Sequence, residues 1–323
     1  MKKGLLFSLA VPLFFSALAL TSCGKNKNYD IISTSFAGYD FARAVAGDEM
    51  SSGMLLNPGE ELHDYSPSIG DRESILNSKV FIYIGGESDK EWVENQILPK
   101  IDKDKTKVIN MMDVILDNNG SSYYEEEPLP DIASSSEDEE EESEYDEHIW
   151  NSISNAKLIV NYIDLVLEEI DSSKKETYKT NSKNYIEKLD EVDNNIKGVL
   201  NEASKNLLVF ADRFPLLYFV REYNLDYVAA FKGCDTSKDA APTTIEVLTN
   251  KVLDNDIKVI FVIELSEANV ANPIKKNVVN QGKELEIRTF YTMHNVSEDD
   301  FKKGTTYIDF MNKNIESLRI ALN

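Results

Sequence analysis

The chain has 323 residues and a formal net charge of −23. That acidic balance argues against a nucleic-acid-binding protein, because phosphate backbones demand basic surface. The length is sufficient for two lobes, each with its own hydrophobic core. The chain has only two cysteines, Cys23 and Cys234. If Cys23 carries a lipid, as its sequence context suggests below, no disulfide bond can form within the chain.

The N-terminus has the pattern of a lipoprotein export signal. Residues 1–3 read MKK, residues 4–20 are almost wholly apolar, and residues 20–23 read LTSC. This order predicts a signal peptide over residues 1–22, followed by Cys23, whose sulfur would carry the lipid. A plain signal peptide or an N-terminal anchor helix is the alternative. We therefore expect a bacterial protein that is lipid-anchored on the extracytoplasmic face of the cell membrane.

Short β-branched runs alternate with helical patterns along the rest of the chain. The expected strands are 30–35, 54–56, 79–84, 107–111, 207–210, 226–231, 259–263 and 285–290. Helical patterns cover 36–46, 90–98, 243–253, 268–280 and 306–322. This alternation predicts parallel sheets covered by helices. The fold class is therefore α/β with two lobes, residues 23–173 and 206–323, each a four-stranded parallel sheet flanked by helices.

A long helical region separates the two sets of strands. Residues 155–170 form one helical pattern and residues 174–205 a second. The second carries one apolar stripe with spacings of 4-3-4-3-4, made of Tyr185, Leu189, Val192, Ile196, Val199 and Ala203. A helix of this length spans about 45 Å. The apolar stripe covers fewer than three heptads, which is too few for a coiled coil. We therefore predict a rigid linking helix that joins the lobes and prevents wide hinge closure.

An acidic segment interrupts the N-terminal lobe. We expect a flexible loop over residues 117–147, because 13 acidic residues and no Lys or Arg lie from Glu125 to Glu147. Residues from about Ser121 to Glu144 would be accessible to proteases and dispensable for folding. Its carboxylates are able to gather divalent ions weakly, but a solvated linker is the simpler interpretation.

The three histidines are the candidate functional residues. His63 lies in a turn-rich segment after the second expected strand, His148 follows the acidic segment, and His294 follows the last strand. Imidazole is the commonest protein ligand of zinc and also binds manganese. Three imidazoles and one carboxylate would complete a tetrahedral site. The spacing alone leaves open that these are three unrelated surface histidines.

Several segments resemble a known family in order along nearly the whole mature chain. Residues 59–68 read GEELHDYSPS, 146–150 read DEHIW, 80–86 read VFIYIGG before Glu91-Trp92, 218–225 read YFVREYNL, and 261–264 read FVIE. They resemble the cluster A-I solute-binding lipoproteins of zinc and manganese ABC importers, whose lobes are joined by one rigid helix. The family's motifs are G-x-x-x-H-x-Y-x-P-S around its first ligand and D-P-H-x-W around its second. Glu147 stands where proline is usual.

The resemblance implies that His63, His148 and His294 are metal ligands, although His294 stands roughly where the family usually has an aspartate. Asp212 is the nearest candidate for a fourth ligand, offset by one residue from the family position, and a helix N-cap is its alternative role. Glu264 is expected to support the ligands from behind or to bind directly. Cys234 is expected to be structural.

The function implied is that of a receptor, not an enzyme. It would capture Zn²⁺, or alternatively Mn²⁺, between the lobes and deliver the ion to the membrane permease of an ABC importer, as a monomer. The alternatives are a lipid-anchored metal-dependent hydrolase and an adhesin-like surface protein with a structural metal. The sequence has no His-Glu-x-x-His helix, Gly-x-Ser-x-Gly elbow or phosphate loop, which argues against the hydrolase.

Overall fold

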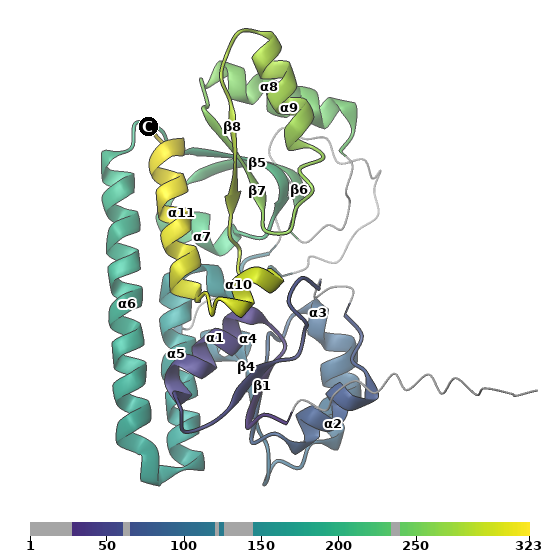
Figure 1. Cartoon of the computed structure of the whole chain (residues 1–323), viewed down its shortest axis with the longest axis vertical. Helices are drawn as coiled ribbons and strands as arrows, with labels where there is room; N and C mark the ends of the chain where they lie inside the picture. Colours follow the sequence, from purple (N-terminus) through teal and green to yellow (C-terminus); the bar gives the residue numbers. More distant parts are fainter. Residues whose placement is uncertain (1–27, 61–64, 120–122, 126–144, 234–239) are drawn as a thin grey trace, which may run out of the picture.

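The computed structural model describes residues 28–60, 65–119, 123–125, 145–233 and 240–323. Two lobes lie one above the other, and a long helix runs along one side of both (Figure 1). Cys23, His63, Cys234 and most of the predicted acidic loop lie outside the described residues. Within the described residues, no helix combines the length and apolar character needed to cross a bilayer.

The N-terminal lobe is built on a parallel four-stranded sheet. Its strands are β1 (Ile31–Ser33), β2 (Ser52–Met54), β3 (Val80–Tyr83) and β4 (Lys107–Asn110), in the order β2-β1-β3-β4. The helical elements are α1 (Phe36–Ala46), α2 (Ile69–Asn77), α3 (Glu87–Asp89), η1 (Lys90–Ile97), η2 (Leu98–Lys100), α4 (Met111–Asn119), η3 (Ile149–Asn151) and α5 (Ile153–Ile170). Every residue of β3 is buried, as is typical of a parallel strand covered on both faces.

The C-terminal lobe repeats this strand order. Its strands are β5 (Leu207–Phe214), β6 (Asp226–Lys232), β7 (Val259–Ile263) and β8 (Glu286–Phe290), in the order β6-β5-β7-β8, and all pairs are parallel. Its helices are α7 (Leu217–Tyr223), α8 (Pro242–Asp254), α9 (Ala271–Asn280), α10 (Glu298–Lys302) and α11 (Tyr307–Ala321). The register between β5 and β6 shifts between Phe210 and Arg213, which is a bulge near the end of β5.

The helix between the lobes is α6 (Lys175–Glu202), which follows the short turn η4 (Ser172–Lys174). Its 28 residues span about 42 Å. The predicted apolar stripe is buried from Tyr185 to Val199, and α6 packs against α5, α1 and α11. The single linking helix predicted from the sequence is therefore confirmed.

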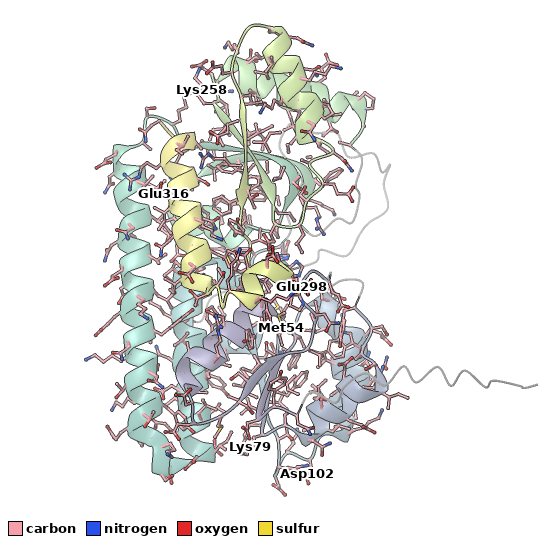
Figure 2. The ribbon with its side chains drawn as sticks, in the orientation of Figure 1. Met54, Lys79, Asp102, Lys258, Glu298 and Glu316 are labelled. Atoms are coloured by element: carbon pink, nitrogen blue, oxygen red, sulfur yellow. The ribbon has the colours of Figure 1, made fainter. Side chains whose placement is uncertain are left out.

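The carboxyl ends of the two sheets face each other. Lys79 and Lys258 directly precede β3 and β7, and they lie toward opposite ends of the molecule, whereas Met54, the last residue of β2, lies at the junction of the lobes (Figure 2). Ligands of open α/β sheets bind outside the carboxyl ends of the strands. The junction is therefore the place in this fold where a ligand from either sheet would be expected.

One hydrophobic core runs through both lobes. Its members include Phe36 of α1, Leu189 of α6, Phe290 of β8 and Phe310 of α11. The rings of Phe36 and Phe310 meet edge to face with centroids 5.6 Å apart. Two smaller cores each belong to one lobe, around Phe81 in the N-terminal sheet and around the β5–β7 face in the C-terminal sheet.

All eight predicted strands are present, so the predicted fold class is confirmed, but several local predictions differ from the structure, including β5, which runs to Phe214 instead of ending at 210. The second strand covers Ser52–Met54 instead of 54–56, and the region predicted as an ordinary helix over 90–98 is largely a π-helix. Helix α4 continues through Asn119, into the first residues of the predicted loop. The helix predicted from 268 begins at Ala271, because Leu265 and Ala268 have positive φ angles of 63° and 57°, which no right-handed helix accommodates.

Candidate metal site

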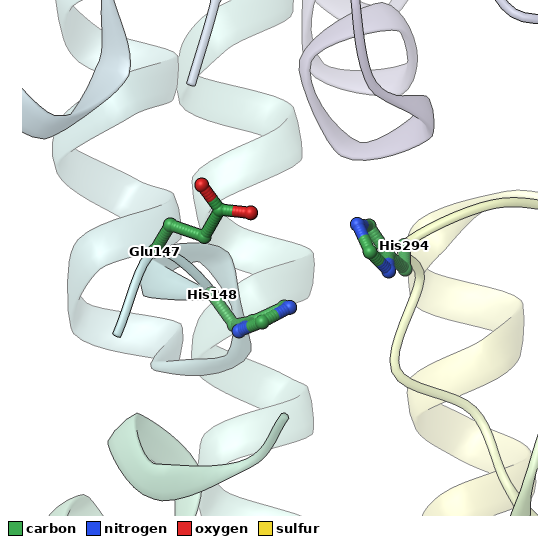
Figure 3. Close-up of side chains that lie close together, drawn as sticks. All are labelled: Glu147, His148 and His294. Atoms are coloured by element: carbon green, nitrogen blue, oxygen red, sulfur yellow. The ribbon is translucent and has the colours of Figure 1, made fainter. Parts of the chain in front are cut away.

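Three residues at the junction bring metal-binding atoms together. One ligand atom from each of Glu147, His148 and His294 lies within 4.8 Å of the other two (Figure 3). Glu147 and His148 directly precede η3 in the N-terminal lobe, and His294 follows β8 in the C-terminal lobe. The side chains are buried, with 6%, 1% and 8% of their residues' surface exposed, respectively. The donor atoms are therefore already shielded from water.

His148 is oriented by the carboxylate that lies two residues before it. Asp146 Oδ1 accepts a hydrogen bond from the His148 backbone N–H at 2.8 Å and lies 2.9 Å from the ring Nδ1. Because an ionised carboxylate only accepts, the proton belongs on Nδ1, and Nε2 keeps its lone pair. A carboxylate behind an imidazole raises its basicity and fixes its direction toward a metal. His148 therefore has the arrangement expected of a ligand that binds through Nε2.

The segment that carries His294 is held by Glu264, which directly follows β7. Glu264 Oε2 accepts from the Thr292 backbone N–H at 2.7 Å, and Oε1 accepts from Thr292 Oγ1 at 2.7 Å and from the His294 N–H at 3.2 Å. Burial raises the pKa of Glu264, and these hydrogen bonds oppose the rise. Met293, between the two bonded residues, has a φ of 56°. The loop is thus folded tightly around the carboxylate, as the predicted supporting role of Glu264 requires.

Two hydrogen bonds tie the segment that carries His148 to the C-terminal lobe. The Trp150 indole N–H donates to the Thr292 carbonyl at 2.8 Å, and the Tyr307 hydroxyl donates to the Trp150 carbonyl at 2.7 Å. As a result, the rings of His148 and His294 lie with their centroids 5.1 Å apart at an angle of 82°. Two imidazoles from opposite lobes therefore face one small volume.

Glu147 is the member of the group that the sequence analysis did not propose as a ligand. Its Oε2 accepts from the Ser88 backbone N–H at 3.1 Å, and its Oε1 accepts from the Ser88 hydroxyl. Gly86 makes room for it, because a Cβ there would lie 2.2 Å from Glu147 Oε2. Burial raises the pKa of Glu147, and the positive charge of a protonated His148 would lower it. The signal available in the sequence was a carboxylate adjacent to a proposed histidine ligand.

Of the other two predicted ligands, Asp212 is not in this group. His63 lies outside the described residues. Asp212 lies in the bulge near the end of β5, where its Oδ1 accepts from the Arg213 backbone N–H at 2.8 Å. Its Oδ2 is shielded from solvent and has no hydrogen-bond partner among the residues that the structure describes. The helix that follows begins at Leu217 with Leu216 as its N-cap, so the alternative role of Asp212 as a helix cap is wrong.

The residues before His63 contact the residues after His294. The Gly59 backbone N–H donates to the Val296 carbonyl at 2.9 Å, and the Asn295 side chain donates to the carbonyls of Asn57 and Glu60. Glu60 therefore lies beside the C-terminal lobe, three residues before His63 in the chain.

The donor set suits a transition metal. Imidazole nitrogen with a carboxylate oxygen is typical of zinc sites and is also accepted by manganese. Calcium and magnesium, which prefer oxygen ligands throughout, are a poor match for two imidazoles. The residues at the junction therefore fit a divalent ion of borderline hardness.

Comparison with known proteins also indicates a relationship to metal-binding proteins. The family described as zinc-uptake complex component A, periplasmic (ZnuA), matches residues 31–321. The zinc-binding lipoprotein AdcA of Streptococcus pneumoniae is 30% identical over 308 residues, which cover 94% of this chain and 58% of AdcA. The chain thus spans well under two thirds of the length of AdcA. The high-affinity zinc uptake system protein ZnuA of Bacillus subtilis is 25% identical over 298 residues, which cover 92% of this chain and 89% of that protein.

Solved structures share the fold. The Zn(II)-bound ZnuA-like domain of S. pneumoniae AdcA superposes with a TM-score of 0.70 at 26% identity, covering 91% of this chain and 99% of that domain. The periplasmic zinc-binding protein TroA of Treponema pallidum has a TM-score of 0.70 at 18% identity, a likeness of fold alone. Because the family match covers almost the whole described chain, and because the two-lobed fold agrees with it, this chain belongs to the ZnuA family of zinc-uptake components.

Proposed function

We propose that this chain is an extracytoplasmic receptor that captures a divalent transition metal between its lobes and delivers it to the permease of an ABC importer. The main support is that His148 and His294, both buried, come from opposite lobes and have ring centroids only 5.1 Å apart. Zinc is the first candidate ion, because AdcA and ZnuA of similar sequence are named for zinc. Manganese is the alternative, since its sites use imidazole together with carboxylate.

The proposed imidazole ligands are His63, His148 and His294. The contact of Glu60 with Asn295 supports the place of His63, because it brings the chain close to His294 three residues earlier. Asp212 is kept as the acidic candidate from the C-terminal lobe. Its support is a shielded Oδ2 without a hydrogen-bond partner among the described residues, a condition that is costly for a carboxylate unless a cation completes it.

An ion held this way would bridge the lobes. Ligands on both sides of the junction mean that a modest shift of one lobe against the other separates them, whereas α6 limits larger hinge motion. The described fold has its own shared core, so the metal-free chain is expected to remain folded. Reversible loading follows from this combination, and it distinguishes a receptor from an adhesin-like protein with a structural metal, which would unfold without its ion.

The test is metal-dependent thermal stability. We expect zinc to raise the melting temperature of chelator-treated protein, because a ligand that binds only the native state adds about 2.7 kcal/mol at one hundred times its dissociation constant. His63→Ala, His148→Ala and His294→Ala should each lose most of this shift and keep the metal-free fold. Glu91→Gln, an exposed carboxylate on η1, is the control that should respond as the wild type does. Wild-type zinc and manganese affinity in all three histidine variants would contradict the proposal.

Membrane attachment is a separate part of the proposal. We place the protein on the extracytoplasmic face of the membrane through a lipid on Cys23, as a monomer. The zinc-binding lipoprotein AdcA supports this by similarity. Cys23→Ser should release the protein from membranes into the medium, as measured by fractionation. Retention of the serine variant in the membrane fraction would mean that another segment holds it there.

A further inference from the structure

We propose that Glu147 is a direct metal ligand, which supplies a carboxylate oxygen to the ion beside His148 and His294. This inference rests on the proposed function, since it assigns the carboxylate ligand of the same site to Glu147, with Asp212 as the alternative. Glu147 is adjacent in sequence to His148, and its carboxylate reaches the same volume as both imidazoles, within 4.8 Å (Figure 3).

The distances leave little movement to complete the site. With bonds of about 2.0–2.2 Å to nitrogen and oxygen, donors around a tetrahedral zinc are roughly 3.3–3.5 Å apart. The three donor atoms lie no more than 4.8 Å apart. A contraction of about 1.5 Å or less therefore brings them into bonding range, which small side-chain rotations provide.

The surroundings of Glu147 hold its carboxylate in place. Ser88 donates one hydrogen bond to each oxygen, from its backbone N–H and its hydroxyl. Each carboxylate oxygen has two acceptor positions, so a metal bond does not require these hydrogen bonds to break. Gly86 leaves the space that the carboxylate occupies. Ser88 and Gly86 are therefore positioning residues that direct Glu147 toward the histidines from α3 and the turn before it.

The residue type at this position affects which ion is preferred. Proline, which is usual at position 147 in the family that this sequence resembles, offers no metal donor, whereas glutamate adds a negatively charged oxygen ligand. Oxygen ligands favour manganese relative to an all-imidazole set, and they also bind zinc. Glu147 is thus expected to strengthen the binding of both ions and to reduce the preference of the site for zinc over manganese.

The decisive variant is Glu147→Gln, which keeps the shape of the side chain and removes its charge. We expect zinc affinity, measured by chelator competition at fixed pH, to fall on the order of 10–100-fold, and manganese affinity to fall more. X-ray absorption at the zinc edge should show one oxygen ligand fewer than in the wild type. If Glu147→Gln fails to fold, Ser88→Ala is the second variant, because it leaves the carboxylate intact and removes one of its hydrogen-bond donors. Ser88→Ala should weaken the binding of both ions, and of manganese more than of zinc.

Two further variants separate the outcomes. Glu91→Gln should bind both ions as the wild type does. If Glu147→Gln binds zinc and manganese within about threefold of wild type, under 1 kcal/mol, while His148→Ala loses binding, the assignment of Glu147 is wrong and the receptor function stands. If Asp212→Asn instead shows the loss expected for Glu147→Gln, the oxygen ligand comes from the C-terminal lobe. If the histidine variants bind normally, the proposed function itself fails.

Discussion

The two lobes share one strand order but hold their histidines by different means. In the N-terminal lobe, Asp146 contacts the ring of His148 at Nδ1 as well as its backbone N–H. In the C-terminal lobe, Glu264 contacts the backbone N–H of His294 and both donors of Thr292. A contact with the ring sets its tautomer and basicity, whereas contacts with the backbone set where the loop lies. Asp146, which contacts the ring, should therefore affect metal affinity more than Glu264 does, whereas Glu264, with three bonds to the loop, should matter mainly for the stability of the loop and of the fold around it.

The largest effect is expected from Glu264→Ala. Thr292 is fully buried, and the variant removes the acceptor for its N–H, its hydroxyl and the His294 N–H. Each unsatisfied buried donor costs about 1–3 kcal/mol, so the free energy of unfolding of the metal-free protein should fall by about 3–5 kcal/mol. Urea denaturation measures this. Glu267→Ala, an exposed carboxylate three residues later, is the control, and a loss below about 1 kcal/mol for Glu264→Ala would contradict the comparison.

A smaller effect, on binding more than on folding, is expected from Asp146→Ala. Without the carboxylate at Nδ1, the His148 ring loses its fixed direction and part of its basicity, and metal affinity should fall about 10–100-fold. Asp146→Asn keeps an acceptor for Nδ1–H and should lose less. Calorimetric titration with zinc measures both. If Asp146→Ala lowered the free energy of unfolding of the metal-free protein by as much as the free energy of metal binding, the two lobes would hold their histidines in the same way.

The smallest effect is a pH dependence of the metal-free protein. Burial, and to a smaller extent the nearby carboxylate of Glu147, raises the pKa of Asp89 to about 7. The pKa of an aspartate in the unfolded chain is about 3.9. Between these values the unfolded state loses a proton that the native state keeps, so stability falls as pH rises from about 4 to 7. The decline should be on the order of 1 kcal/mol, because a native carboxyl that relaxes toward solvent loses part of the shift.

The comparison variant for this pH dependence is Asp89→Asn, which cannot ionise and should show a flatter decline over the same window. The measurement is urea denaturation in chelator at several pH values. With zinc present the direction should reverse below about pH 6, because protons compete with the ion for the imidazoles. An Asp89→Asn profile parallel to that of the wild type would show that another group is responsible.

Strands and helices were predictable where the local pattern alone decides them. The run of residues 259–263 is apolar, β-branched and bounded by polar residues, and it is β7 without any shift. The π-helix η1 was not separable from an α-helix, since both place apolar residues on one face. The helix predicted from 268 begins later, because a positive φ at Ala268 depends on tertiary packing and leaves no mark in the sequence.

The candidate site was predictable only in part for the same reason. His148 and His294 stand out because histidines are rare in this chain and because their neighbours resemble a known family. Glu147 did not stand out, since its direction depends on Ser88 and Gly86, about 60 residues earlier in the chain. Its carboxylate also follows a strongly acidic stretch, in which one more glutamate carries no signal.

The core that both lobes share has a consequence for how the protein is made. Phe310 and Tyr307 of α11 pack against Phe36 and Phe41 of α1, so the first and last helices of the described chain complete one another. A chain made from its N-terminus releases the N-terminal lobe long before residues 307–321, and until then one face of α1 lacks its partner. The shared core is therefore incomplete until α11 is present, although each lobe also has a smaller core of its own. We expect the N-terminal lobe to reach its final packing only after α11 has docked on α1.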